Sequence, residues 1–321
     1  YLAGALACLL AVTALAYVLD GRLGALHRTR AVRSAVVLTC LLAPVLTRTA
    51  PMGHPEEALA GALCVLAVLA ALSGRSGWAG LALGAAAAAK PWAVIAGLPV
   101  LLAAESGRVR LLLTALGAGA AAELPFLIAT PAGVGGTATS LHSAHGPFHP
   151  TQLFWPLREV LVDPVTGATG HRGPAIVARF SHPLIVGLAV PLSALFALRL
   201  RAGRVSRTDA LALLALLLLL RCLLDPWNTI YYALPAILAL VAWEGLSRPA
   251  LPVGAMALAA LTWLTFVALP EHVSADGLMA GSGAPHLDAT QLGRYREAVG
   301  GRPGEELASI VADLRASGLA V

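Results

Sequence analysis

The sequence predicts an all-α, polytopic membrane protein. Of its 321 residues, 58% are hydrophobic and 12% are charged, whereas a soluble domain is about half apolar and about a quarter charged. Apolar runs such as "VGLAVPLSALFAL" and "ALLALLLLLRCLL" reach, with their flanks, the roughly 20 residues that a helix needs to cross a bilayer. Arginines separate these runs instead of collecting in one patch. The pattern favours a helical bundle with about 9–10 spans and a loop region on its outer face.

The N-terminal part is expected to hold three spans. The first covers residues 1–19, and the arginine-rich stretch "DGRLGALHRTRAVR" follows it. The second covers residues 35–47, and "RTAPMGHPEEA" separates it from a third at 57–73. Because the chain begins with Tyr1 inside an apolar run, we expect that its natural N-terminus lies further upstream.

The next apolar run, residues 77–104, is long for one helix and short for two full spans. Lys90 and Pro91 interrupt it near the middle, and a proline disfavours the helical conformation in the residue before it. The run therefore predicts a short helix that ends at Lys90 and a second helix that returns to the same side. A further span is expected over residues 111–129.

Residues 182–198 and 250–269 each predict one more span. Between them, the apolar run over residues 209–243 is interrupted by "RCLLDPWN". The argument used for the earlier run predicts a second pair of helices, which meet at Asp225 and Pro226.

A transmembrane domain over residues 1–269 is therefore expected to precede a polar tail, residues 270–321. Within the tail, "GEELASIVADLRASGL" has the pattern of a short amphipathic helix. Residues 130–180 are expected to form an outer loop. About twelve of the 22 Lys and Arg residues fall in the short loops assigned to the cytoplasm, as the positive-inside rule requires. Both helix breaks then lie on the opposite, outer side.

Two cations mark the interrupted runs: Lys90, the only lysine of the chain, and Arg221. Charged side chains within spans usually face a cavity or a partner. Two of them on one side indicate a site for an anionic head group, such as a lipid phosphate. The aromatic residues Trp92, Trp227 and Tyr231 follow the two breaks and are candidates for the same surface. Snorkelling to the interface, or bonds to the carbonyls that end each helix, would explain the two cations equally well.

Acidic residues on the same side have two explanations each. Glu56 and Glu57 suit the positive end of a helix dipole, so a structural role alone accounts for them. One of them could instead act as a base, or bond a polar substrate, with His54 beside it. Asp225 could cap the turn that follows it, or pair with Arg221 four residues earlier on the same helix face.

His142, His145 and His149 lie in the predicted outer loop near Phe154 and Trp155. Three histidines at this spacing could bind a metal, but no carboxylate stands close by and no second cluster supports it, so a metal site is disfavoured. An aromatic lid over a sugar site, with His145 and His149 as binding residues, and ordinary interfacial belt residues are the two readings left.

Several function classes are not expected. The sequence holds no GxGxxG, P-loop, GxSxG or HExxH motif, so nucleotide hydrolysis and redox chemistry with a soluble cofactor are disfavoured. Basic and aromatic residues do not alternate in the way typical of nucleic-acid binding. All four cysteines fall in apolar runs without metal spacing, which predicts buried free thiols: Cys8, Cys40, Cys64 and Cys222.

Four stretches together resemble the family-87 branch of the GT-C glycosyltransferases. They are "GLALGAAAAAKPWAVIAGLPVLL", "GHPEEALAGALCVLA", "ELPFLIATPAG" with the later "GPFHPTQLFWPL", and "LLDPWNTIYYALPAILALVAWE". The resemblance covers roughly residues 1–270 and rests on the order and spacing of these stretches.

This resemblance implies a GT-C-like bundle in a bacterial plasma membrane, and the composition suggests a GC-rich, actinobacterium-like source. Such enzymes take a sugar, often mannose, from a polyprenyl-phosphate carrier and pass it to a glycolipid or glycan acceptor on the outer face. The transfer proceeds with inversion and without a metal or other cofactor. By motif, Lys90 matches the cation that stabilises the leaving phosphate, and Arg221 matches it by position.

Two departures from the family pattern bear on the function. The family's main catalytic acid normally lies in the first outer loop, which here would precede Tyr1, so Glu56 and Glu57 would be partial substitutes. The second departure is the polar tail, which stands where family members usually carry further spans.

Two alternative functions stay open. A transporter or flippase of a polar or lipid-linked substrate is one alternative, because interrupted helices with nearby charges also mark transport sites. A non-catalytic membrane scaffold or fragment is another.

Overall fold

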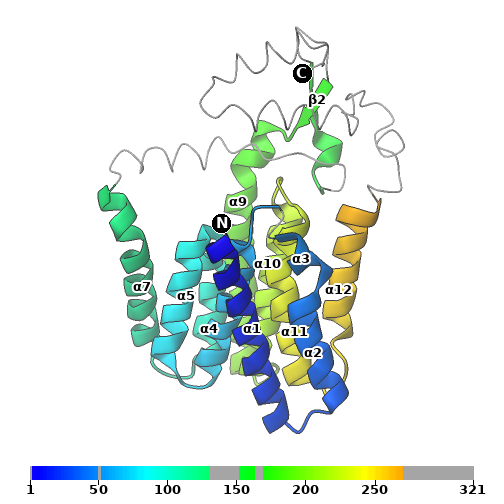
Figure 1. Ribbon diagram of the computed structural model, residues 1–321. Coiled ribbons are helices and arrows are strands. Elements are labelled where there is room, and N and C mark those ends of the chain that lie inside the picture. The colour runs from blue at the N-terminus through cyan, green and yellow to red at the C-terminus, as the bar shows by residue number, and fades with distance from the viewer. Residues whose placement is uncertain (1, 50–51, 130–151, 163–168, 270–321) are drawn as a thin grey trace.

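A computed structural model describes residues 2–49, 52–129, 152–162 and 169–269. These residues form a bundle of helices whose axes run in a common direction (Figure 1). The predicted all-α membrane fold is confirmed. The loop histidines His145 and His149 and the tail over residues 270–321 lie outside the described residues.

The helices follow the predicted spans closely. They are α1 (Leu2–Ala25), α2 (Arg30–Leu42), α3 (Pro44–Thr49), α4 (Glu56–Leu72), α5 (Ser76–Ala89), α6 (Gly97–Ala103), α7 (Arg108–Ala129), α9 (Ala175–Arg201), α10 (Ala210–Leu224), α11 (Leu234–Ser247) and α12 (Val253–Trp263). Short 3₁₀ turns cover Pro91–Ala96, Trp155–Leu157, Arg207–Asp209 and Ile230–Ala233, and a π-turn covers Leu264–Ala268. Two strands, β1 (Glu159–Val162) and β2 (Thr169–Arg172), pair antiparallel with Glu159 opposite Arg172. They lie beyond the start of α9 (Figure 1).

Among the described residues, four helical stretches are long and apolar enough to cross a membrane. They are Gly4–Ala25, Arg30–Thr49, Ala175–Arg201 and Ile230–Ser247. The outward faces of the peripheral helices are apolar, as a lipid-facing surface requires. Leu116 on α7 is 69% exposed and Leu10 on α1 is 59% exposed. The protein is thus a polytopic membrane protein, in which the helix Ile230–Ser247 is the most buried of the four long stretches.

Both predicted helix breaks are present. The backbone leaves the helical region at Lys90, with φ −149° and ψ 119°, and again at Asp225, with φ −77° and ψ 120°. In the first pair of helices, the Ser76 hydroxyl at the start of α5 donates to the Ser106 carbonyl oxygen just after α6, at 3.1 Å. The chain therefore goes out along α5 and returns to the same end, as the sequence predicted.

The second pair of helices, α10 and α11, also begins and ends at one end of the bundle. The indole N–H of Trp243, near the end of α11, donates to the Asp209 carboxylate at the start of α10, at 2.8 Å. Both breaks consequently lie at one end of the bundle, together with the first residues of α4. We call this end the site end.

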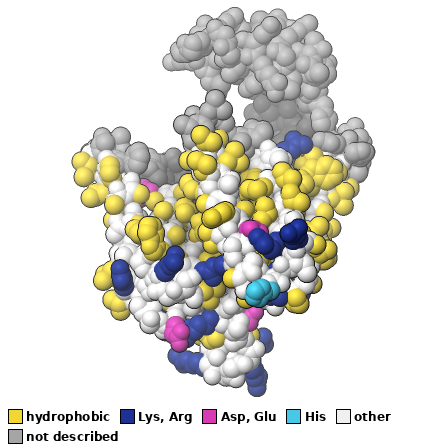
Figure 2. Space-filling view, turned by 60° about the horizontal axis from the view of Figure 1, so that its bottom comes forward, with side chains coloured by type: hydrophobic (Ala, Val, Ile, Leu, Met, Phe, Trp, Pro, Cys, Tyr) yellow, Lys and Arg dark blue, Asp and Glu magenta, His cyan; other side chains and the backbone are white. Residues whose placement is uncertain are grey.

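Arginines hold the opposite end together. Guanidinium groups there bond the free carbonyls at helix C-termini, where cations are favoured. Arg22 donates to Leu69 at the end of α4, Arg28 to Leu246 at the end of α11, and Arg207 to Leu102 at the end of α6. Figure 2, in which this arginine-rich end comes forward, shows basic side chains over it. Arg22, Arg28 and Arg207, which the sequence analysis assigned to loops on one side, thus lie at one end of the bundle.

Small residues let neighbouring helices approach closely, as is common in membrane bundles. A Cβ atom on Gly84 of α5 would lie 2.8 Å from the Ala118 Cβ of α7. A Cβ atom on Gly61 of α4 would lie 2.9 Å from the Pro235 Cα of α11. The contact between α4 and α11 brings the first turn of α4 beside the end of α10.

Candidate functional site

A buried ion pair lies at the centre of the site end. The Glu57 side chain, on the first turn of α4, is 2% exposed, and the Arg221 side chain, on the last turn of α10, is 5% exposed. Arg221 Nη1 donates to Glu57 Oε2 at 3.3 Å, and Nη2 donates to Oε1 at 3.2 Å. The two terminal nitrogens of the guanidinium thus bond the two oxygens of the carboxylate, which is the bidentate geometry of strong Arg–carboxylate pairs. Each charge offsets the desolvation of the other, which explains how both can be buried.

Aromatic rings enclose the Arg221 guanidinium. Its central carbon lies 4.4 Å from the centre of the Trp92 ring and 4.2 Å from that of Tyr232. Arginine suits this position because its planar group stacks on aromatic faces while it bonds a carboxylate in its own plane. Trp92 also donates from its indole N–H to Glu57 Oε1 at 3.1 Å. Trp92 therefore contacts both members of the buried pair.

Lys90 lies one step nearer the surface. Its ammonium group is 2.8 Å from Glu56 Oε1 and 3.7 Å from Glu57 Oε1, and its side chain is 22% exposed. The extended backbone at Lys90, which Pro91 enforces, turns this side chain from the end of α5 toward the first turn of α4. An ammonium group has three donors, so Lys90 retains capacity for a ligand.

The rim of the cluster is formed by Glu56 and His54. The His54 Nδ1 atom is 3.0 Å from Glu56 Oε1, and the two side chains are 40% and 32% exposed. The His54 ring also packs against Tyr231, with 4.5 Å between ring centres. Exposure thus increases outward through the cluster, from the Glu57–Arg221 pair through Lys90 to His54.

Asp225 and Trp227 form a neighbouring group just beyond α10. Asp225 is 6% exposed, and its Oδ1 accepts a bond from the Trp227 backbone N–H at 2.9 Å. Its Oδ2 lies 3.5 Å from Nε2 of His182, on α9. Of the two roles considered for Asp225, the structure shows the cap of the following turn, whereas Arg221 bonds Glu57 because α4 packs against α10.

The arrangement leaves one cation, Lys90, partly exposed at the rim of the cluster. Two carboxylates and two cations balance in charge, and the buried Arg221 lies between two aromatic rings. Among the described residues, no group of three or more His, Cys, Asp or Glu side chains is arranged to hold a metal ion.

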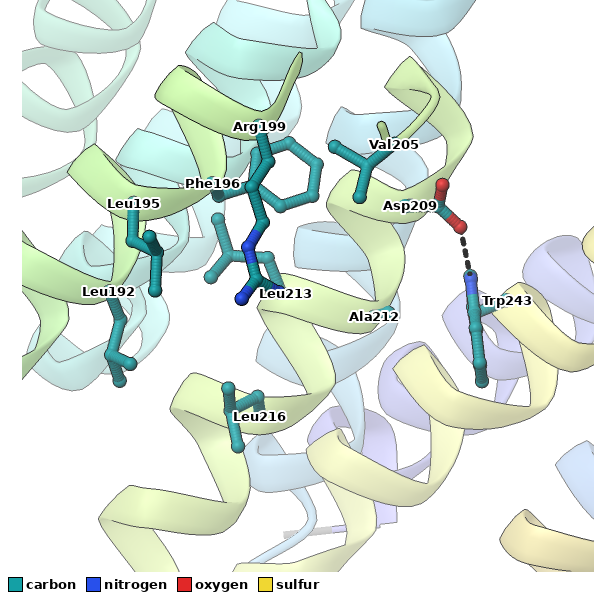
Figure 3. A pocket seen from close by; sticks show the side chains of 10 residues that line it. All are labelled: Leu192, Leu195, Phe196, Arg199, Val205, Asp209, Ala212, Leu213, Leu216 and Trp243. Carbon is teal, nitrogen blue, oxygen red and sulfur yellow. Dashed lines mark hydrogen bonds between the residues drawn. The ribbon is translucent and has the colours of Figure 1, made fainter. Parts of the chain in front are cut away.

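A groove of about 360 Å³ lies toward the arginine-rich end, between α9, α10 and α11 (Figure 3). Its lining is mostly apolar: Leu192, Leu195, Phe196, Arg199, Val205, Asp209, Ala212, Leu213, Leu216 and Trp243. The Asp209 carboxylate is already bonded to Trp243, as the dashed line in Figure 3 marks. No member of the charged cluster lines this groove, so we assign the chemistry to the site end.

Comparison with known proteins gives one match. The sequence profile of glycosyltransferase family 87 matches residues 1–226, which include the Glu57, Lys90 and Arg221 positions. The chain belongs to glycosyltransferase family 87. No curated protein and no solved structure matches it significantly.

The family-87 protein is thus a membrane glycosyltransferase, as the sequence stretches around Lys90 and Asp225 implied. The structure brings together these predicted site residues: His54, Glu56, Glu57, Lys90, Trp92, Arg221 and Tyr231. Asp225 and Trp227 lie beside this cluster, at the end of α10.

Two residues of the family-87 protein escaped sequence reasoning. Tyr232 stacks on Arg221, and its position directly after Tyr231 was the only available signal. His182 lies near Asp225. The only signal in the sequence was that His182 is a polar residue at the start of the apolar span predicted over residues 182–198. Neither contact follows from helical spacing, because each joins two separate elements whose packing local rules do not predict.

Proposed function

We propose that this glycosyltransferase transfers a sugar, most simply mannose, from a polyprenyl-phosphate carrier to a glycolipid or glycan acceptor. The reaction takes place at the site end, which the positive-inside rule assigns to the outer face of a bacterial plasma membrane. The acceptor hydroxyl attacks the anomeric carbon, and the carrier phosphate leaves from the opposite side, which inverts the configuration.

The observation that supports this proposal is the environment of Lys90. Negative charge accumulates on the phosphate oxygen as its bond to the sugar breaks. A cation held in place before the reaction stabilises that charge without reorganisation. Glu56 and Glu57 hold the Lys90 ammonium group from one side and leave its outer side partly exposed. No metal is needed for this role.

Arg221 acts indirectly in this proposal. Its guanidinium is bonded to Glu57 and enclosed by two rings, so it is not available to a phosphate. It instead fixes the Glu57 carboxylate, which in turn orients Lys90 and Trp92. Arg221 is therefore a positioning residue, and Lys90 is the group that contacts the substrate.

The test is sugar transfer by the purified protein in lipid vesicles supplied with polyprenyl-phosphate mannose and a lipid extract as acceptor. We expect Lys90→Ala to lower kcat by about 10²–10³-fold, because the lost interaction strengthens in the transition state. Lys90→Arg should retain part of the activity. The matched control is Arg179→Ala, which removes an exposed cation from α9.

Normal transfer by Lys90→Ala would contradict the role of Lys90. Efficient transfer from a nucleotide-linked sugar, with none from the polyprenyl-phosphate sugar, would contradict the donor class. Parallel assays with carrier-linked mannose, glucose and arabinose decide the sugar.

A further inference from the structure

The groove between α9, α10 and α11 opens on a lipid-facing part of the surface. Leu195 on α9 and Leu216 on α10 line it, and their side chains are 46% and 48% exposed. Leucine side chains offer water no hydrogen bond, so a hydrocarbon chain fills such a groove within a membrane better than water does. Its volume of about 360 Å³ lies within the range of about 300–1,000 Å³ that is usual for small-molecule sites.

The groove extends over most of one leaflet. It runs along α9 from Leu192 to Arg199 and along α10 from Leu216 to Asp209. At about 1.5 Å per residue this distance is about 10 Å, whereas one leaflet contributes about 15 Å of hydrocarbon. Its polar residues, Arg199, Asp209 and Trp243, are those nearest the arginine-rich end, where α9 and α11 end and α10 begins. An acyl chain in the groove would therefore have its head group at that end.

Arg199 brings a positive charge into the groove. Its side chain points into the groove from α9 (Figure 3), and within the described part of the chain it takes part in no hydrogen bond or ion pair. The Asp209 carboxylate is bonded elsewhere: Oδ1 accepts from the Trp243 indole at 2.8 Å, and Oδ2 accepts from the backbone N–H and the hydroxyl of Ser206 at 2.8 and 2.9 Å. The N–H donors of Arg199 are thus left for an anion from outside these residues.

Further cations surround this end of the groove. Residues 199–209 include four arginines and one aspartate. The exposed Arg248 lies over the ring of Trp243, with 4.7 Å between its guanidinium carbon and the ring centre. The positive-inside rule assigns this end to the cytoplasmic side, whose leaflet carries anionic lipids. Basic pockets between helices on that side suit phosphate-bearing head groups, so charge and location together favour an anionic phospholipid.

We propose that this groove binds one anionic phospholipid of the cytoplasmic leaflet, with its phosphate at Arg199 and one acyl chain along Leu195 and Leu216. The site is separate from the charged cluster, and the proposal does not depend on the sugar donor or acceptor. A lipid held here contacts α9 and α10 together and so ties α9 to the α10–α11 pair. Because it binds the folded state, it should also raise the melting temperature.

The test titrates the protein, purified in detergent, with phosphatidylglycerol and with phosphatidylcholine that has the same acyl chains. Native mass spectrometry counts the bound lipids. We expect the first phosphatidylglycerol to bind the wild-type protein with an about tenfold lower Kd, the effect of one hydrogen bond to a charged group. Arg199→Gln should remove most of this difference. Arg201→Gln, the matched control, removes an exposed arginine of the same last turn that does not line the groove, and it should keep the difference.

A second pair of variants tests the acyl chain. Leu216→Trp places a larger side chain in the groove without a change of charge, and it should weaken phosphatidylglycerol binding several-fold. Leu223→Trp makes the same change about two turns further along α10, at a position that is 51% exposed and outside the groove, and it should leave binding unchanged. Soluble glycerol phosphate, which has the head group but no chains, should not compete.

Four results would overturn the proposal. Equal affinity of the wild-type protein for the two lipids, or equal losses in Arg199→Gln and Arg201→Gln, would remove the role of Arg199. Competition by glycerol phosphate would show an anion site without a place for a chain. Tighter binding of polyprenyl phosphate than of phosphatidylglycerol would assign the groove to the carrier. A change of oligomeric state in Leu216→Trp, with lipid binding intact, would assign it to a second copy of the chain.

Discussion

The Glu57 carboxylate and the Arg221 guanidinium meet through two hydrogen bonds of 3.2 and 3.3 Å, although the residues are 164 positions apart in the sequence. The pair joins the first turn of α4 to the last turn of α10 and is almost completely buried. Its energetics are asymmetric: removal of one partner of a buried pair costs about 3–5 kcal/mol, whereas replacement of both is often nearly neutral.

The first prediction follows from this asymmetry. Arg221→Met should lower the melting temperature strongly, because Glu57 is left buried without its counter-charge. The double variant Glu57→Gln with Arg221→Met should regain much of the loss, and a double-mutant cycle measured by thermal unfolding in detergent would detect it. Arg33→Met is the matched control, since it breaks an Arg–carboxylate pair with Asp20 that is about one-third exposed and should change stability by about 1 kcal/mol or less. A double variant less stable than Arg221→Met would contradict the explanation.

A second prediction separates the two contacts of Trp92. Trp92→Phe keeps a ring over Arg221 but removes the N–H bond to Glu57. The expected loss is about 1 kcal/mol, the usual net contribution of one hydrogen bond. Trp92→Leu also removes the stacking and should be less stable than Trp92→Phe. Equal melting temperatures for the two variants would show that the ring contributes nothing.

The close approach of α5 and α7 gives a third prediction. Gly84→Ala places a methyl group 2.8 Å from the Ala118 Cβ, so the helices must separate. We expect a lower melting temperature and poorer recovery of folded protein. Gly117→Ala, on α7 itself, meets no atom within 4 Å, and it should be neutral or slightly stabilising because Ala favours a helix over Gly by about 1 kcal/mol. Equal effects of the two substitutions would rule out the packing argument.

Glu244 gives a fourth prediction. This buried carboxylate, on α11, accepts from the backbone N–H groups of Gly254 and Ala255 at the start of α12, at 3.1 and 2.9 Å. Glu244→Ala should therefore loosen the first turn of α12, which hydrogen exchange over residues 253–257 would report as faster exchange. Glu105→Ala, an exposed carboxylate at the same end, should leave that exchange unchanged.

The free thiols give a fifth prediction. Cys8, Cys40, Cys64 and Cys222 are buried and unpaired, so a maleimide reagent should label none of them in intact membranes. Labelling should appear only after denaturation. Rapid labelling of native protein at Cys64 or Cys222, which lie on the two helices that carry the ion pair, would contradict the packing of α4 against α10.

Local sequence rules predicted the elements well and the contacts between them poorly. Proline and the polar residues around it marked the breaks at Lys90 and Asp225, because a proline limits the backbone of its neighbour wherever it occurs. The same rules offered Arg221 a partner four residues away, and it bonds Glu57 instead. Helical spacing reveals which side chains share a face, whereas the choice between two carboxylates depends on which helices pack together. The stacking of Tyr232 and the approach of His182 to Asp225 depend on packing in the same way.

The lengths of α5 and α10 fix the depth at which the charged cluster lies. These helices hold 14 and 15 residues, which at 1.5 Å per residue gives about 21 and 22 Å, against a hydrocarbon layer of about 30 Å. Measured from the arginine-rich end, the helix breaks therefore stop short of the far membrane surface. Lys90, which follows α5 directly, is therefore expected to lie below the level of that surface, within one leaflet. The lipid-linked donor proposed above would then reach Lys90 by diffusion within that leaflet, with its hydrocarbon chain still surrounded by lipid.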